Sequence, residues 1–284
     1  MCVFAGVATP LVRRRFFLWI SYKGSRYSGV QRQSALRDKP GEICTVQGVL
    51  DAAFNASLRL ASPASVILSS RTDAGVHALM NTGHVDLIQR WSSRMDDKTR
   101  HKAEETEIAQ KVNDLLLEYK HDVSVRKVLR MPNWFHSRCS ACRRTYVYRI
   151  AVPKVACTGT EARTLLPQEE WRRCWAVASG LDIELTRKAC QLLEGVHDFQ
   201  LFKNISDDTR TTKRLIEEFS LCPEHKSGQQ YLDPRLADLF TWWRFTVTGK
   251  SFLYRQVRRM VGAVLAVGYQ RIPIEKVRLS FGVH

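Results

Sequence analysis

Asp73 is the residue whose surroundings best suit covalent chemistry. It lies in a glycine-containing segment, Arg71–Ala78, directly after a short apolar run, and Arg71 and His77 flank it. A carboxylate at the end of a strand, in a loop with cationic neighbours, is well placed to act on a substrate. Spacing alone favours a simpler role, an aspartate that caps its own turn. An aspartic protease would need a second such aspartate, and the sequence has no second Asp-Ala-Gly motif.

The segment around Asp73 resembles that of a known enzyme family. Ser70–Ala78 (SRTDAGVHA) is similar to the active-site segment of the TruA family of tRNA pseudouridine synthases. Six further segments, on either side of it, resemble motifs of this family and follow its order: Tyr22–Gln31 (YKGSRYSGVQ), Thr45–Gln47 (TVQ), Phe135–Arg138 (FHSR), Arg144–Tyr148 (RTYVY), Gly195–Phe199 (GVHDF) and Phe252–Gly262 (FLYRQVRRMVG). The resemblance covers most of the chain, and within the family it points to the animal tRNA pseudouridine synthase-like 1 group.

The resemblance implies three catalytic residues. Asp73 matches the aspartate that attacks the target nucleoside, either at C1′ of the ribose or at C6 of the base. Arg258 matches an arginine that pairs with this aspartate, and a nearby guanidinium keeps a carboxylate ionised. Tyr146 matches a tyrosine whose ring stacks on the flipped base and whose hydroxyl handles a proton. Without the resemblance, Arg258 would be interpreted as a solvated helix residue, and Tyr146 equally as a core residue of an alternating strand.

A second set of polar residues is expected to contact the substrate. They are Lys23, Arg26, Gln31, Arg71, His77, Arg255 and Arg259. Arg255, Arg258 and Arg259 are spaced i, i+3 and i+4, so they share one edge of a helix, as expected for the wall of a basic cleft. Val30 and Arg259 stand where many family members have Trp and Asn, which bears on substrate contacts rather than on the central chemistry.

The resemblance also implies a substrate, tRNA or another RNA, and a reaction that needs no cofactor. The family isomerises uridines around positions 38 to 40, in the anticodon stem-loop. The target uridine must leave the base stack to be reached, at a cost of a few kcal/mol that is smallest in loops. Isomerisation involves no net redox change or group transfer, so no cofactor is expected. Family resemblance further predicts a homodimer.

Composition independently favours a polyanionic partner. The chain has 284 residues and a formal charge of +16, from 44 Lys and Arg against 28 Asp and Glu. Nucleic acid is the usual partner of so basic a chain, because binding of phosphates releases counterions. A basic protein that binds no nucleic acid is the alternative. No apolar run approaches the roughly 20 residues of a membrane-spanning helix, so no association with a membrane is expected.

The eight cysteines are scattered, which is typical of reduced thiols in an intracellular compartment. Cys139 and Cys142 form a Cys-x-x-Cys pair. A structural zinc site needs a second close pair of Cys or His, and none follows at suitable spacing. We therefore predict no metal.

Patterns of apolar residues predict the elements that position the site. Strands are predicted at 16–22, 66–69, 82–88, 123–129, 145–152 and 240–248. Helices are predicted from the N-cap Thr45, from Glu104, around Leu185–Leu193 with an end at Gly195, and from Leu253 to Gly268. Residues around 153–180 are predicted to be irregular. Strands and helices do not alternate strictly, which favours an α+β fold. The resemblance adds two similar halves, with largely antiparallel sheets flanked by helices, around a central basic cleft.

The expected organisation is a basic segment, 1–15, an N-terminal half, 16–133, a linker, 134–144, and a C-terminal half, 145–284. The first 37 residues hold seven Lys or Arg and no acidic residue. Such a start fits a short mitochondrial targeting segment or a basic end near RNA, so the compartment is mitochondrial or cytoplasmic.

The sequence leaves two alternatives to an active pseudouridine synthase. Family members usually continue beyond the last helix with a segment that closes the pocket, and this chain is short there. The first rival is therefore a catalytically impaired RNA-binding protein on the same scaffold. The second is an unrelated hydrolase that uses Asp73, and no partner acid, metal-ligand set or Ser/His pair supports it.

Overall fold

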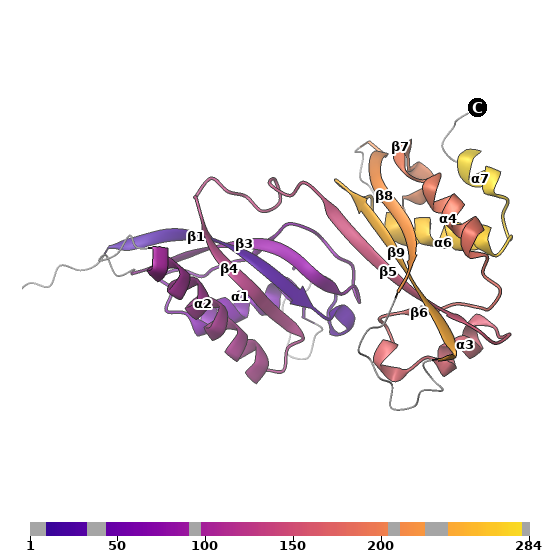
Figure 1. Cartoon of the computed structure of the whole chain (residues 1–284). Helices are drawn as coiled ribbons and strands as arrows, with labels where there is room; N and C mark the ends of the chain where they lie inside the picture. The colour runs from indigo at the N-terminus through magenta and orange to yellow at the C-terminus, as the bar shows by residue number, and fades with distance from the viewer. Residues whose placement is uncertain (1–9, 33–43, 91–97, 204–210, 225–237, 280–284) are drawn as a thin grey trace, which may run out of the picture. The chain divides into compact units, whose positions relative to one another are not determined.

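A computed structural model describes residues 10–32, 44–90, 98–203, 211–224 and 238–279. The chain divides into two compact units, Met1–Ala141 and Cys142–His284. Each unit combines one sheet with flanking helices, which confirms the predicted α+β class (Figure 1). Within the described part of the chain, no helix is long and apolar enough to cross a lipid bilayer.

The first unit is a four-stranded sheet in the order β2-β3-β1-β4. Its elements are β1 (Leu11–Tyr22), α1 (Val46–Ser57), β2 (Ile67–Leu68), β3 (Ala78–Arg90), α2 (Lys98–Glu118) and β4 (Val123–Met131). All its strand pairs are antiparallel. The helices α1 and α2 lie on the same face of the sheet (Figure 1).

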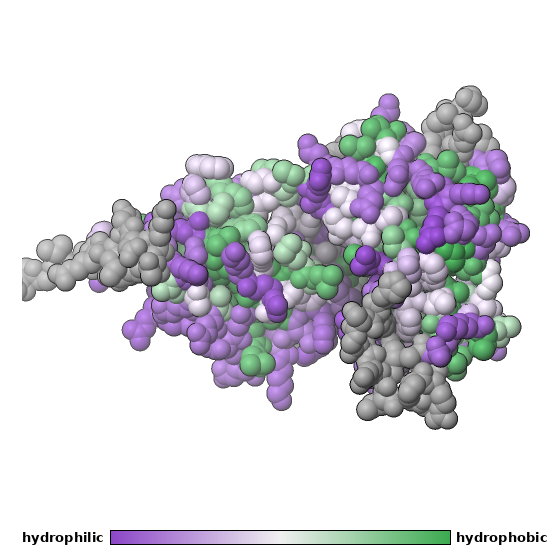
Figure 2. All heavy atoms as spheres, viewed as in Figure 1, coloured by the Kyte–Doolittle hydropathy of each residue, from purple (hydrophilic) through white to green (hydrophobic). Residues whose placement is uncertain are grey.

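The core of this unit lies between the sheet and the two helices. Phe16, Leu18 and Ile20 alternate along β1 and are fully buried, and Phe54 of α1 and Leu116 of α2 pack into the same cluster. This alternation is the period of a strand with one buried face. Hydrophilic residues cover most of the visible surface over α2 (Figure 2).

Three elements of the first unit begin earlier than the sequence predicted, and one of them is β3, which starts at Ala78 rather than at Thr82. β1 starts at Leu11 rather than at Phe16, because ion pairs stabilise its first residues in the sheet. Arg14 pairs with Glu104 and Arg15 with Asp86, with N–O distances of 2.9 and 2.7 Å. α2 starts at Lys98 rather than at Glu104, although its first turns are polar. By contrast, Thr45 caps α1 as predicted: its side-chain oxygen accepts a hydrogen bond from the backbone of Gly48.

The second unit is a five-stranded sheet in the order β6-β5-β9-β8-β7. Its elements are β5 (Arg144–Pro153), α3 (Gly159–Leu165), β6 (Trp175–Ala176), α4 (Ile183–Gln191), β7 (Gly195–Asp198), β8 (Lys213–Pro223), β9 (Phe240–Gly249), α6 (Gln256–Gly268) and α7 (Ile274–Leu279). β5 and β6 are parallel, and the other pairs are antiparallel. Ile150, Phe219, Phe245 and Val261 are fully or almost fully buried in the core that α4 and α6 share with the sheet.

Two predictions for this unit were wrong. The stretch around 153–180 is not irregular throughout: it contains α3 and β6. α3 forms because Thr158 and Glu161 make a reciprocal capping box at its start. Gly195 does not end α4, which stops at Gln191. Gly195, which has a positive φ of 97°, is instead the first residue of β7. The predicted end of α6 at Gly268 is confirmed.

Candidate active site

Asp73 lies in the loop Ser69–His77 that joins β2 to β3, which we call the Asp73 loop. The side chain of Asp73 is half-buried, and its backbone carbonyl accepts a hydrogen bond from the amide of Val76 at 3.2 Å. Gly75, with φ of 79°, completes this turn in a conformation that other residues rarely adopt. The turn therefore leaves the carboxylate reachable while the backbone beneath it is closed on itself.

Two glycines of the preceding loop form the floor under the Asp73 loop. A Cβ atom on Gly24 would lie 1.9 Å from the carbonyl oxygen of Val76, and one on Gly29 would lie 3.2 Å from that of Thr72. The amide of Val30 donates to the carbonyl of Thr72 at 3.1 Å. The backbones approach so closely here that only glycine fits at Gly24, and Gly29 has a positive φ of 115° as well.

A buried set of polar side chains holds the start of the loop. The hydroxyl of Tyr22 lies 2.8 Å from that of Thr72, and the amide of Asn81 donates to the Tyr22 hydroxyl and to the carbonyl of Ser70, both at 3.2 Å. Burial raises the pKa of Tyr22, so its hydroxyl stays protonated. The loop is thus fixed through residues on β1 and β3 before any substrate arrives.

Asn81 is a functional neighbour that sequence reasoning missed. It is 6% exposed and lies near the start of β3, at a buried strand position where an apolar residue is the usual occupant. A buried amide side chain in a strand needs hydrogen-bond partners, so an asparagine at this position of the sequence could have indicated a polar network. Its partners could not be identified from sequence, since Tyr22 is 59 residues away.

The predicted substrate contacts of this unit differ in their surroundings. Arg26 donates to the carbonyl of Lys120 at 2.8 Å and lies 3.5 Å from Asp122, so it is tied to the turn before β4. Lys23 is exposed, and its backbone amide donates to the carbonyl of Asp122 at 2.9 Å. His77 is half-buried. Gln31 and Arg71 are exposed, and both line one pocket in this unit.

Tyr146 of the second unit lies half-buried on β5. Its ring meets that of Phe252 edge to face, with centroids 5.1 Å apart. Two residues along the same face of the strand, Tyr148 packs edge to face against Trp175 of β6 at 6.2 Å. Burial raises the pKa of Tyr148, while the charge of Arg258 lowers it, so Arg258 of α6 lies within electrostatic reach of this aromatic row.

The three arginines at the start of α6 do not share one environment. Arg258 is exposed. Arg255 has φ of 59°, an uncommon value for an arginine, and its guanidinium lies over the ring of Tyr254 at 5.1 Å. Arg259 donates to the carbonyls of Lys203 at 2.9 Å and Leu201 at 3.3 Å, so it connects α6 to the turn after β7.

The start of α6 itself is fixed by a buried glutamine. Gln256 is fully buried, and its side-chain oxygen accepts a hydrogen bond from the amide of Leu253 at 2.7 Å. This contact satisfies a backbone donor at the helix N-terminus, as a capping residue does. It sets the direction in which α6 presents Arg258. Among the described residues, no three side chains from His, Cys, Asp and Glu gather as a metal site would require.

Comparisons with known proteins agree with these features. Residues 189–281 match the sequence profile of a family described as tRNA pseudouridine synthase. The chain is 35% identical over 266 residues to tRNA pseudouridine synthase-like 1 of Mus musculus, covering 92% of this chain and 82% of that protein. It is 34% identical over 263 residues to the Homo sapiens protein of the same name, covering 92% and 79%.

The similarity extends to bacteria. The chain is 32% identical over 256 residues to tRNA pseudouridine synthase A of Dinoroseobacter shibae, covering 89% of this chain and 82% of that protein. Identity at this level over about nine tenths of this chain and about four fifths of each relative establishes common descent. The chain belongs to the family of tRNA pseudouridine synthases, isomerases that convert uridine to pseudouridine.

Proposed function

We propose that this protein isomerises uridine to pseudouridine in the anticodon stem-loop of tRNA, with Asp73 as the nucleophile. The observation that carries the proposal is the Asp73 loop: a half-buried carboxylate stands on a backbone that Gly24, Gly29 and Tyr22 hold in place. Pre-organised placement of a reacting group is a large part of enzymatic rate enhancement. Family membership supplies the reaction class.

In this mechanism the Asp73 carboxylate attacks the nucleoside, at C1′ or at C6. The bond between N1 and C1′ breaks, the uracil rotates, and a new bond joins C5 to C1′. The proton on C5 is lost, and N1 ends protonated, so atoms and charge balance. The aspartate is released unchanged, which is covalent catalysis without a net group transfer.

Arg258 and Tyr146 are proposed as the residues of the second unit that assist this step. Arg258 is assigned to keep the Asp73 carboxylate ionised, because a guanidinium favours the charged form of a nearby carboxylate. Tyr146 is assigned to stack on the flipped uracil. Support for the second role is its orientation: Phe252 packs edge to face against its ring, which fixes the ring plane.

Tritium release from RNA carrying [5-³H]uridine measures the reaction directly, because C5 loses its hydrogen when the new bond forms. We expect release from a tRNA anticodon stem-loop by the purified protein, and none by Asp73→Asn. Asp114→Asn is the matched control, an exposed aspartate on α2 in the same unit. Turnover of Asp73→Asn close to that of the wild type would remove Asp73 from the mechanism. RNA binding without release by the wild type would favour the impaired, RNA-binding alternative.

A further inference from the structure

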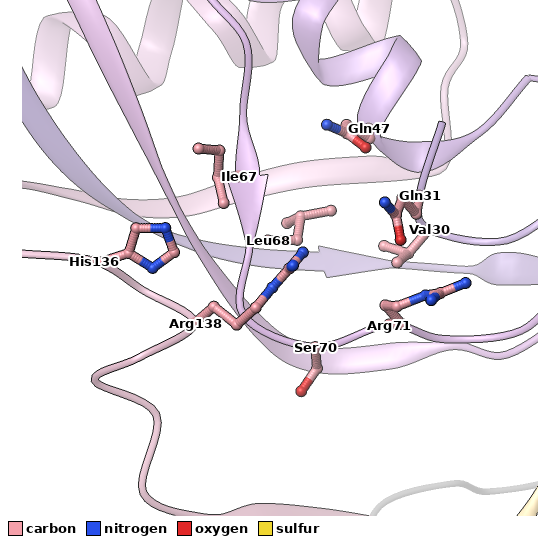
Figure 3. Close-up of a pocket in the computed structure, with 9 residues that line it drawn as sticks. All are labelled: Val30, Gln31, Gln47, Ile67, Leu68, Ser70, Arg71, His136 and Arg138. Carbon is pink, nitrogen blue, oxygen red and sulfur yellow. The ribbon is translucent and has the colours of Figure 1, made fainter. Parts of the chain in front are cut away.

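A pocket of about 320 Å³ lies beside the Asp73 loop in the first unit. Val30, Ile67 and Leu68 give it an apolar floor, and Gln31, Arg71 and Arg138 are among the polar residues that line it (Figure 3). Among the residues that the structure describes, no carboxylate lines it. Its volume is at the lower end of the range for small-molecule sites, roughly 300 to 1,000 Å³, so it suits one small group rather than a helix or strand.

Two guanidinium groups are available in this pocket. Arg71 and Arg138 are both exposed, and neither makes a hydrogen bond or ion pair with another residue in the part of the chain that the structure describes. They come from separate segments, the Asp73 loop and the stretch after β4, and converge on one pocket. Two arginines that line one pocket, with no carboxylate among its described lining residues, can receive a phosphate group.

The segment that carries Arg138 is built into the sheet rather than loosely attached. Ser137 is 2% exposed: its amide donates to Nδ1 of His84 at 3.2 Å, and its hydroxyl donates to the carbonyl of Ile67 at 2.9 Å. Two residues before Ser137, the carbonyl of Phe135 accepts a hydrogen bond from Arg15 of β1, which also forms an ion pair with Asp86. The backbone on which Arg138 stands is therefore set by β1, β2 and β3.

The pocket shares its wall with the Asp73 loop but does not include Asp73. Val30 lines the pocket and donates through its amide to Thr72, the neighbour of Asp73. Arg71 is two residues before Asp73. Whatever occupies the pocket is thus next to the reacting nucleotide, and is not that nucleotide.

We propose that this pocket binds one unpaired nucleotide of the RNA next to the target uridine, with its base on the apolar floor and its phosphate between Arg71 and Arg138. The inference rests on the proposed function for the identity of the RNA. A nucleotide carries both a flat base and a phosphate, so one ligand can contact the apolar floor and the two arginines together. A bound flanking nucleotide also holds the chain in the splayed form that base flipping requires.

The test measures binding of stem-loop RNAs in which one flanking position is changed at a time. At each position next to the target, either the base is removed or the phosphate is replaced by a neutral methylphosphonate. With the wild-type protein, we expect one neighbouring position at which each change weakens binding by about tenfold, the size of one good charged or stacking contact.

Arg138→Ala is the test variant, and Arg138→Lys separates charge from the planar fork. We expect Arg138→Ala to weaken binding of unmodified RNA by about tenfold and to lose all further sensitivity to the methylphosphonate at that position, while sensitivity to base removal remains. Arg126→Ala is the matched control: it removes an exposed arginine from β4, at the opposite edge of the sheet from β2. It should retain both sensitivities in full.

Additive losses from Arg138→Ala and the methylphosphonate at every position would overturn the inference. So would RNA binding by Arg138→Ala equal to that of the wild type, with circular dichroism confirming that both are folded. Displacement of the RNA by an acidic peptide, lost in Arg138→Ala but not in Arg126→Ala, would identify a protein ligand instead. The proposed function fails separately, if the wild-type protein releases no tritium from C5, since the binding measurements do not depend on turnover.

Discussion

The hydroxyl groups of Tyr22 and Thr72 lie 2.8 Å apart, so the residue before Asp73 is hydrogen-bonded to a buried side chain of β1. Asn81 donates to the same tyrosine oxygen from β3. Two strands of the sheet thus meet at one phenol, which contacts the residue before the proposed nucleophile. The arrangement transmits the rigidity of the sheet to a loop that has few apolar contacts of its own.

Tyr22→Phe should loosen the Asp73 loop without changing the surface. Removing the hydroxyl deletes the hydrogen bonds that Thr72 and Asn81 make with it, and we expect the free energy of unfolding to fall by about 1 kcal/mol. The single-turnover rate should fall several-fold more than the affinity for RNA. Tyr119→Phe is the control, at a site that is 63% exposed, and it should change neither the free energy of unfolding nor the single-turnover rate. Equal rates for Tyr22→Phe and the wild type would show that the loop needs no support from β1.

Gly24→Ala and Gly75→Ala separate close approach from backbone strain. A methyl group on Gly24 meets the Val76 carbonyl at 1.9 Å and must displace the Asp73 loop, whereas one on Gly75 has nothing within 4 Å and costs only the strain of a positive φ, about 1 kcal/mol. We expect Gly24→Ala to lower the single-turnover rate at least tenfold more than Gly75→Ala. Similar rates for the two variants would show that the close approach of Gly24 to Val76 does not position the Asp73 loop.

His84 should make stability depend on pH. It is 1% exposed, and burial, together with the charges of Arg15 and His136, lowers its pKa to about 4. The unfolded chain, with an ordinary pKa near 6.5, binds the proton first, so stability is complete above about pH 6.5 and is lost as the pH falls toward 4. At pH 5 the loss for this residue is roughly 2 kcal/mol.

Urea unfolding of the wild type and His84→Gln at pH 7.5 and pH 5 measures this effect. Glutamine retains an acceptor for the Ser137 amide but does not titrate, so the variant should lose less stability between the two pH values. NMR titration of the His84 ring in the folded protein gives the pKa itself. A ring that titrates near pH 6.5 in the folded state would contradict the prediction.

Arg258→Lys should lower the rate while the fold stays intact. Lysine retains the charge but lacks the planar fork that holds a carboxylate at two points, and we expect at least a tenfold loss in single-turnover rate, or about 1.4 kcal/mol in the barrier. Arg244→Lys, an exposed position on β9, is the control. If Arg258 acts through Asp73, the loss should disappear in the Asp73→Asn background, and a full additional loss there would separate the two residues.

RNA affinity should fall steeply with salt because of the charge of +16. For about five neutralised phosphates, the log–log slope is roughly −4. Arg255→Ala should flatten the slope by about one. Arg259→Ala should in addition destabilise the protein by about 1 kcal/mol, since its guanidinium holds two carbonyls of the turn after β7. An affinity independent of salt would place the basic surplus away from the RNA.

Local patterns predicted much of this fold, because they depend on neighbours in the sequence. The aromatic and β-branched residues of Phe16–Tyr22 predicted β1, and Thr45 and Gly268 correctly marked the start and end of helices. The error at Gly195 has a local cause as well, since a glycine with positive φ serves equally to end a helix or to begin a strand.

The site was less accessible to sequence reasoning, because its contacts join distant segments. Ser137 and His84 are 53 residues apart, and the pocket brings Gln31, Arg71 and Arg138 together from three stretches of the chain. The composition of each stretch alone does not indicate that these three residues lie close together. Asp73, Tyr146 and Arg258 were predicted through family resemblance, and their catalytic roles stay predictions.

The Asp73 loop is held mainly through backbone atoms: the carbonyls of Ser70, Thr72, Asp73 and Val76 are contacted, whereas Arg71 and Ala74 point their side chains outward as exposed residues. A loop anchored in this way keeps its shape when its outward side chains are exchanged. Positions 71 and 74 are therefore sites at which RNA preference can diverge between relatives, or be redesigned, while the geometry of the carboxylate is inherited unchanged.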